Sequence, residues 1–180
     1  TALENANLRV TFSSRGGQVK QVLLKNYETY QGEPLVLFVS ESSDTDITFT
    51  SVDGKQIQLS DLYFTASEVK EVQGEGETSG KTITFRAQLG DGQYIEQVYT
   101  LFDKNFLLGY QLDFEGLERQ VSGDNITFTW TDRLKQLERD LKQNRAKSTI
   151  NFATVEDGYD NLSIAEETVT EVVERPLKWV

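Results

Sequence analysis

The side chains that most often perform acid–base, nucleophilic and metal chemistry are missing from this sequence. Its 180 residues include no histidine and no cysteine. A Ser-His-Asp triad, a Cys-His pair and a zinc site with imidazole or thiolate ligands are therefore excluded. Any chemistry would depend on carboxylates, of which aspartate and glutamate supply 29. The sequence predicts a protein that is not an enzyme and has no catalytic residue.

Carboxylates that lie close together in sequence could act as acid–base pairs or as calcium ligands. The three pairs are Asp44 with Asp46, Glu75 with Glu77, and Asp157 with Asp160. Each pair lies in a polar stretch that we expect to be a loop, and none continues into an EF-hand pattern with its closing glutamate. Solvated surface charge is the ordinary explanation. We expect no metal site and no cofactor.

One segment has a charge pattern that differs from the rest of the chain. Between Asp132 and Lys147 there are six basic and three acidic residues, a local charge of +3 in a chain of net charge −11. Within it Leu134, Leu137 and Leu141 recur at i, i+3 and i+7. This spacing predicts one amphipathic helix from Asp132 to Lys147, anchored by the leucine stripe.

Two interpretations of these basic residues stay open. They could form an ordinary solvated face above the leucines, or they could dock an acidic partner. A tryptophan near the C-terminal end could join the second kind of contact, because its amphipathic ring suits the headgroup region of a bilayer. The candidate partner-binding residues are Arg133, Lys135, Arg139, Lys142, Arg145 and Trp179.

The elements that must carry these residues are mostly strands. The stretch Leu8 to Leu24 alternates apolar and polar residues, turns at Arg15-Gly16-Gly17 and resumes an apolar run, which predicts a hairpin. Lys81 to Leu89 alternates in the same way and turns at Asp91-Gly92. Strands recur at intervals of roughly 8 to 12 residues, the spacing of an antiparallel sandwich. The predicted fold is all-β with one helix near the C-terminal end.

The same alternation predicts which side chains form the core. Leu35 to Val39 is expected as a short, fully buried strand, and Val169 to Val173 as a later strand. Five aromatic residues alternate in phase with aliphatic ones and are expected in the core: Phe85, Tyr110, Phe114, Phe128 and Trp130. Four tyrosines nearer to turns are better candidates for a contact surface: Tyr27, Tyr30, Tyr94 and Tyr159.

The length of the chain limits the number of domains, and its charge limits the classes of partner. A chain of 180 residues fits one domain, residues 1–180, able to bury roughly 70% of the surface that the unfolded chain exposes. Its acidity repels nucleic acid, and its longest apolar run is far shorter than the ~20 residues that cross a bilayer. Because the sequence starts at Thr1 and contains no methionine, we expect it to be excised from a longer protein.

Two parts of the sequence resemble the large periplasmic domain of the YidC membrane protein insertase family. The first is an L-x-V-x-F strand from Leu8, the R-G-G turn, a second strand ending in L-L, and Tyr27 soon after. The second is a helix after Trp130, then I-N-F, the loop D-G-Y-D-N-L at residues 157–162, and the closing L-K-W-V. In this order the resemblance covers nearly the whole chain.

The resemblance implies a super-β-sandwich, similar to galactose-mutarotase-like domains, that lies in the periplasm. It implies tethering to the inner membrane through flanking segments, beside the membrane-embedded region of the same chain. It also implies an insertase and chaperone role in inserting and folding inner-membrane proteins, alone or with the Sec translocon. The expected partners are translocon components or nascent membrane proteins, and not nucleic acid.

Two other functions are alternatives on the same fold. Mutarotase-like enzymes depend on histidines beside a carboxylate, which this sequence lacks, so we expect the fold to serve as a scaffold. A carbohydrate-binding β-sandwich module would need exposed coplanar aromatic residues. A soluble carrier of an apolar ligand or polypeptide would need a deep apolar cavity.

Overall fold

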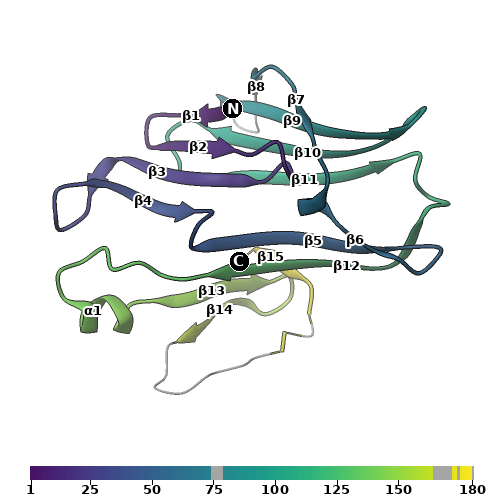
Figure 1. Cartoon of the computed structure of the whole chain (residues 1–180). Helices are drawn as coiled ribbons and strands as arrows, with labels where there is room; N and C mark the ends of the chain where they lie inside the picture. The colour runs from purple at the N-terminus through teal and green to yellow at the C-terminus, as the bar shows by residue number, and fades with distance from the viewer. Residues whose placement is uncertain (74–78, 164–171, 174, 180) are drawn as a thin grey trace. The chain divides into compact units, whose positions relative to one another are not determined.

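The computed structural model describes residues 1–73, 79–163, 172–173 and 175–179. These residues form antiparallel strands with one short α-helix among them (Figure 1), which confirms the predicted all-β class. The chain divides into two compact units, residues 1–134 and residues 135–180. A single domain over residues 1–180 stays a prediction. The pair Glu75 and Glu77, and residues 169–171 of the predicted strand Val169 to Val173, lie outside the described residues.

Three antiparallel sheets make up the first unit. The first sheet has the order β1-β2-β3-β4, with β1 (Ala2–Glu4), β2 (Leu8–Phe12), β3 (Val19–Glu28) and β4 (Pro34–Val39). The second has the order β11-β10-β9-β7, with β8 also on β9; its strands are β7 (Thr65–Ala66), β8 (Lys70–Gln73), β9 (Ser79–Gly90), β10 (Gln93–Phe102) and β11 (Leu108–Glu115). The third has the order β12-β5-β6, with β5 (Ser43–Ser51), β6 (Gln56–Gln58) and β12 (Val121–Asp132). A 3-10 turn, η1 (Leu59–Asp61), follows β6.

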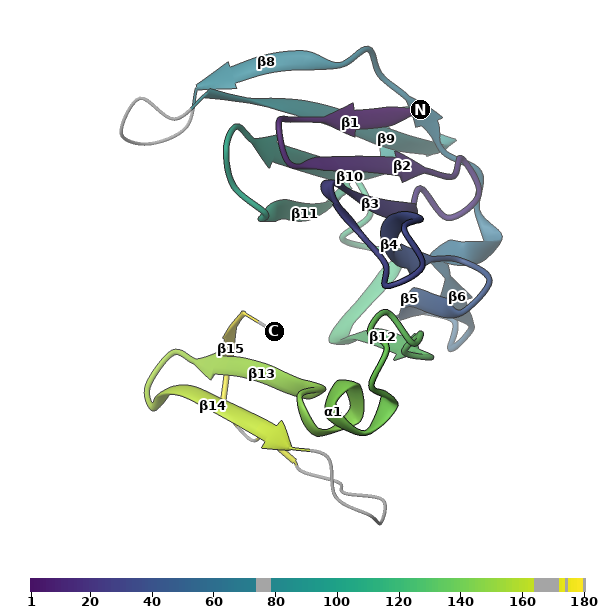
Figure 2. The same cartoon turned by 90° about the vertical axis from the view of Figure 1, so that its left-hand side faces the viewer.

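The core of this unit lies between the first and second sheets, which Figure 2 shows stacked. Alternate residues of β2 and β9 point into it, as the sequence predicts. The ring of Phe12 on β2 lies 5.3 Å from Phe85 on β9 and 4.7 Å from Tyr99 on β10. Phe49 on β5 meets Phe114 on β11 at 5.1 Å, which joins the third sheet to the same core. The predicted antiparallel sandwich is therefore confirmed.

Two predictions about burial are wrong. β4 is an edge strand, so the segment Leu35 to Val39 is not fully buried, and Leu37 is exposed. Phe128 and Trp130 are also exposed, although both alternate in phase with core residues. They lie on β12, the edge strand of the third sheet. Alternation identifies the apolar face of a strand, but it does not show whether another element covers that face.

The second unit contains a three-stranded sheet and the helix. The sheet has the order β14-β13-β15, with β13 (Thr149–Thr154), β14 (Gly158–Ser163) and β15 (Leu177–Trp179). Phe152 and Ala153 on β13 are buried. The helix α1 (Leu141–Ala146) precedes β13, so the predicted position of a helix near the C-terminal end is confirmed.

The predicted length of the helix, Asp132 to Lys147, is wrong. Asp132 ends β12, residues 133–140 have no regular secondary structure, and α1 has six residues. Asp140 caps the helix, because its side chain accepts hydrogen bonds from the backbone N–H groups of Lys142 and Gln143 at 3.0 and 3.1 Å. The leucine stripe does not anchor it either: Leu134 and Leu141 are exposed, and no residue of α1 is buried.

Candidate partner-binding surface

The basic residues predicted to bind a partner lie on an exposed segment, residues 133–147. Arg133, Lys135 and Arg139 belong to its irregular part, and Lys142 and Arg145 lie on α1. All five are exposed, and none forms an ion pair with a described residue. The structure therefore leaves their charge available to solvent. The segment differs in this from six other cations of the chain, which pair with carboxylates: Arg9, Arg15, Lys25, Lys55, Arg86 and Arg175.

Trp179, the remaining predicted contact residue, lies at the end of β15. Its backbone is in register with Ala153 of β13. Its side chain lies outside the part of the chain that the structure describes. The role of Trp179 beside the basic residues therefore stays a prediction.

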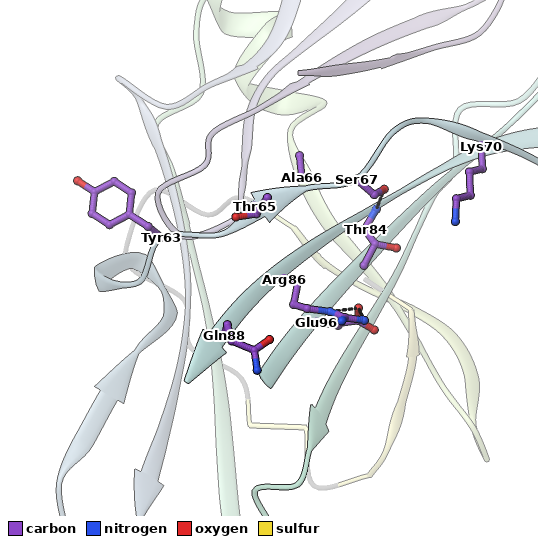
Figure 3. Close-up of a pocket in the computed structure, with 9 residues that line it drawn as sticks. All are labelled: Tyr63, Thr65, Ala66, Ser67, Lys70, Thr84, Arg86, Gln88 and Glu96. Carbon is purple, nitrogen blue, oxygen red and sulfur yellow. Dashed lines mark hydrogen bonds and ion pairs between the residues drawn. The ribbon is translucent and has the colours of Figure 1, made fainter. Parts of the chain in front are cut away.

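A polar, concave surface lies on the outer face of the second sheet, and the hollow that it forms has a volume of about 640 Å³ (Figure 3). Thr84, Arg86 and Gln88 of β9 point outward, opposite to the buried residues between them. Tyr63 and Lys70 lie toward its two ends in Figure 3. Sequence reasoning missed this surface, although the polar residues that alternate along Lys81 to Leu89 are its signal.

Arg86 and Glu96 neutralise each other on this surface, whereas Lys70 forms no ion pair with a described residue. Arg86 Nη2 lies 2.5 Å from Glu96 Oε1, and Arg86 Nε donates a hydrogen bond to the same oxygen at 2.7 Å. The guanidinium of Arg86 also lies 4.0 Å above the centre of the Tyr94 ring. This contact covers one of the four tyrosines predicted as contact residues, whereas Tyr27, Tyr30 and Tyr159 are exposed.

The R-G-G turn is held by a buried polar side chain that sequence reasoning missed. Gln97 on β10 is buried in the core and donates a hydrogen bond from Nε2 to the carbonyl oxygen of Gly16 at 2.7 Å. Gly17 has φ +63°, and a Cβ at Gly17 would lie 2.5 Å from that nitrogen. The sequence signal for this buried contact is the position of Gln97, which lies on the same face of β10 as the buried residues Ile95 and Leu101. The turn therefore requires glycine for both its backbone angle and its contact with Gln97.

Two tyrosines complete this buried network. The hydroxyl group of Tyr110 donates to Oε1 of Gln97 at 3.0 Å, and that of Tyr99 lies 3.4 Å from the same oxygen. Burial raises the pKa of both hydroxyl groups above their usual value, because the charged phenolate would lose its hydration. The prediction that Tyr110 is a core residue is wrong, because Tyr110 is 44% exposed although its hydroxyl group binds Gln97.

Two carboxylates of the pairs considered from the sequence form hydrogen bonds or ion pairs with neighbouring residues. Asp46 accepts hydrogen bonds from Ser60, and Asp157 lies 3.0 Å from Arg175. The described residues hold no group of three or more carboxylates placed to bind a metal ion. Within the same residues, no helix has the length and apolar character required to cross a bilayer.

Comparison with known proteins gives a family for this arrangement. The model of the YidC periplasmic domain matches residues 1–168. Proteins named membrane protein insertase YidC are similar over most of the chain: that of Amoebophilus asiaticus is 33% identical over 99% of this chain and 30% of its own length, and that of Cytophaga hutchinsonii is 34% identical over 92% and 26%. That of Parabacteroides distasonis is 29% identical over the whole chain and 27% of its own length.

The chain thus spans less than a third of the length of these curated relatives. No solved structure matches it significantly. The match to the family model nevertheless covers the whole first unit and residues 135–168 of the second, and it includes the R-G-G turn and the basic segment. The chain belongs to the YidC periplasmic domain family.

Proposed function

We propose that this domain is a non-catalytic docking scaffold of a membrane protein insertase and chaperone. It would lie in the periplasm, tethered to the inner membrane, and assist the insertion and folding of inner-membrane proteins. The observation that carries the proposal is the match to a periplasmic domain over residues 1–168, together with relatives named as membrane protein insertases. The proposed partners are Sec translocon components, nascent membrane proteins and the membrane-embedded region of the same protein.

The basic segment is the surface that we assign to this contact. Its arginines and lysines are exposed and without ion pairs to described residues, in a chain whose net charge is −11. Such charges attract an acidic partner or anionic headgroups over a Debye length of about 8 Å at physiological salt. Leu134 and Leu141, exposed in the same segment, add apolar contact area. Trp179 is a further candidate for this contact.

Charge reversal in the full-length protein tests this assignment. We expect Arg139→Glu with Lys142→Glu to weaken binding to translocon components or to anionic vesicles by about tenfold at low salt, and by less at high salt, because salt screens the attraction. The melting temperature should change by less than about 2 °C, because exposed charges contribute little to stability. Binding is measured to each partner separately, across a series of salt concentrations.

The matched control is Lys20→Glu with Lys70→Glu, which makes the same change in net charge elsewhere. Both lysines are exposed and have no ion pair with a described residue. This control should bind nearly as the unmodified protein does. Unaltered binding to every partner at low ionic strength in the Arg139→Glu, Lys142→Glu protein would show that the basic segment is ordinary solvated surface.

We also propose that the domain has no turnover of aldoses, esters or phosphoesters. Mutarotation of aldoses is the most informative assay, because the predicted mutarotase-like fold invites it. Without histidine, the expected rate equals that of the buffer. A rate well above the buffer that disappears in Glu96→Gln, on the concave surface, would contradict the non-catalytic proposal.

The carbohydrate-binding and carrier alternatives find no support in the described residues. Tyr63 is the one aromatic residue that lines the concave surface, and Arg86 covers the neighbouring ring of Tyr94. A row of exposed coplanar rings, which sugar binding would require, is not present there. The surface is also open and polar, unlike the enclosed apolar cavity of a carrier.

A further inference from the structure

The loop between β10 and β11 presents two large apolar side chains that lie outside the core (Figure 2). Phe106 and Leu107 are 52% and 72% exposed, although both neighbouring strands contribute to the core. The ring of Tyr27, near the end of β3, lies 6.5 Å from the ring of Phe106, edge to face, and is itself 51% exposed. We call these three residues the apolar tip. Contiguous exposed apolar surface is typical of a contact with a protein or a membrane.

A buried side chain fixes the shape of this loop. Asn5, which is 7% exposed, donates hydrogen bonds from Nδ2 to the carbonyl oxygens of Phe102 and Asn105 at 2.7 and 3.0 Å. Lys104, between them, has φ +61° and is the one described residue other than glycine with a positive φ. A backbone that is held in a sparsely populated conformation often marks a functional loop. The loop therefore presents the apolar tip in a fixed arrangement, which lowers the entropy lost on binding.

The apolar tip is remote, along β3, from the point where the chain leaves the first unit. Asp132, the last residue of β12, pairs with Ser43 at the start of β5. The strand before β5 ends at Val39, which pairs with Gln21 near the start of β3. Tyr27 lies toward the other end of β3, about 20 Å away. The contacts that form the tip lie within the first unit, so they do not depend on the position of the second.

We propose that the apolar tip enters the interfacial region of a phospholipid bilayer. Three side chains on a loop offer far less area than the roughly 1,000 Å² that a specific protein interface buries. A bilayer, by contrast, gains from each apolar side chain that reaches it, and the amphipathic ring of tyrosine suits the headgroup level. The inference rests on the proposed location of the domain beside the inner membrane.

Apolar burial, rather than charge, carries this contact. Lys104 is exposed and has no ion pair with a described residue, so it can meet a lipid phosphate. Glu28, which follows Tyr27 and is also exposed, offsets its charge. Salt should therefore affect the contact little, whereas it should weaken any contact of the basic segment.

Quenchers placed in the lipid test the contact in the full-length protein. Any cysteine outside these 180 residues is replaced, and Leu107→Cys carries a fluorescent label in vesicles of phosphatidylglycerol and phosphatidylcholine. A spin label near the headgroup end of the acyl chains should quench this dye, but not a dye at Leu89→Cys. Leu89 is the matched control, because it is an exposed leucine at the opposite end of β9 from the tip. Equal quenching at the two positions, or none at position 107, would overturn the proposal.

Maleimide labelling of the same two thiols shows whether the tip is free to make the contact. In the 180-residue chain without lipid, positions 107 and 89 should react at similar rates. Protection of position 107 in buffer would show that another part of the chain covers the tip. Protection in the vesicles without quenching by the lipid spin label would assign the tip to a protein. Either result would overturn the proposal.

Polar substitutions at the tip give a third measurement. Phe106→Ser with Leu107→Ser should weaken binding of the 180-residue chain to the same vesicles at least about tenfold, at low and at high salt, because apolar burial is lost. The control is Val52→Ser with Leu89→Ser, two exposed apolar residues away from the tip, which should bind as the unmodified chain does. Equal binding of the two variants would contradict the proposal. Charge reversal in the basic segment acts mainly at low salt, so failure of one proposal is distinguishable from failure of the other.

Discussion

At the scale of single residues, the contact between Gly17 and Gln97 explains why the turn has the sequence R-G-G. Gly16 supplies the carbonyl oxygen that Gln97 binds, and Gly17 leaves room for the amide nitrogen. Arg15 fixes the other side of the turn, because its Nε donates to the carbonyl oxygen of Ser60 at 3.0 Å. The turn is thus connected both to the core and to η1.

We predict that Gly17→Ala lowers the free energy of unfolding by about 3 kcal/mol. The positive φ costs roughly 1 to 2 kcal/mol, and displacing Gln97 leaves buried polar groups without partners. Gly32→Ala is the matched control, because Gly32 has φ +79° with no atom near its missing Cβ. Gly32→Ala should lower the free energy of unfolding by only about 1 kcal/mol. Equal losses for the two variants in chemical denaturation would contradict the role assigned to Gln97.

Tyr99 and Tyr110, of which only Tyr99 is fully buried, predict the response of the domain to alkaline pH. Because burial raises the pKa of Tyr99 and Tyr110, the folded chain keeps protons that the unfolded chain releases near pH 10.0. This stability is fully present below pH 10.0 and is lost as the pH rises further. In absorbance titration Tyr99 should ionise only on unfolding, and Tyr99→Phe should move the alkaline unfolding transition to higher pH. Tyr63→Phe, at an exposed position, should not move it.

At the scale of elements, strands were predictable from the sequence and the helix was only partly so. Alternation over nine residues identified β9, and the glycine turns fixed the ends of the hairpins. The leucines at positions 134, 137 and 141 match a helical period, but they span barely two turns, and Leu134 and Leu141 are exposed. A short helix gains its stability mainly from such packing, so α1 forms only where Asp140 caps it.

The exposure of these leucines changes the stability expected from their removal. Leu137 is half-buried, so Leu137→Ala should lower the free energy of unfolding by about 1 kcal/mol, less than the 2 to 4 kcal/mol of a fully buried leucine. Leu134→Ala, at an exposed position, should cost less than about 0.5 kcal/mol. A loss above about 3 kcal/mol for Leu137→Ala in thermal or urea unfolding would restore the leucine anchor predicted from the sequence.

At the scale of the whole molecule, the order of short motifs predicted the family that the comparisons identify. The absence of histidine and cysteine predicts a domain without catalysis, and this stays a prediction. The exposure of Phe128 and Trp130 on β12 could not be predicted, because alternation does not show whether another element covers an apolar face. The role of the basic segment could not be fixed either, since charge and exposure are compatible with solvent as well as with a partner.

Site-specific photo-crosslinking in cells tests the docking account most directly. A photoreactive residue replaces Lys142 of the basic segment, or Lys20 on β3 as control, in the full-length protein. The account predicts crosslinks from position 142 to translocon components or nascent membrane proteins, fewer of them in Arg139→Glu, and few from position 20. Equal crosslinking from both positions, or none from position 142 to any component of membrane insertion, would contradict it.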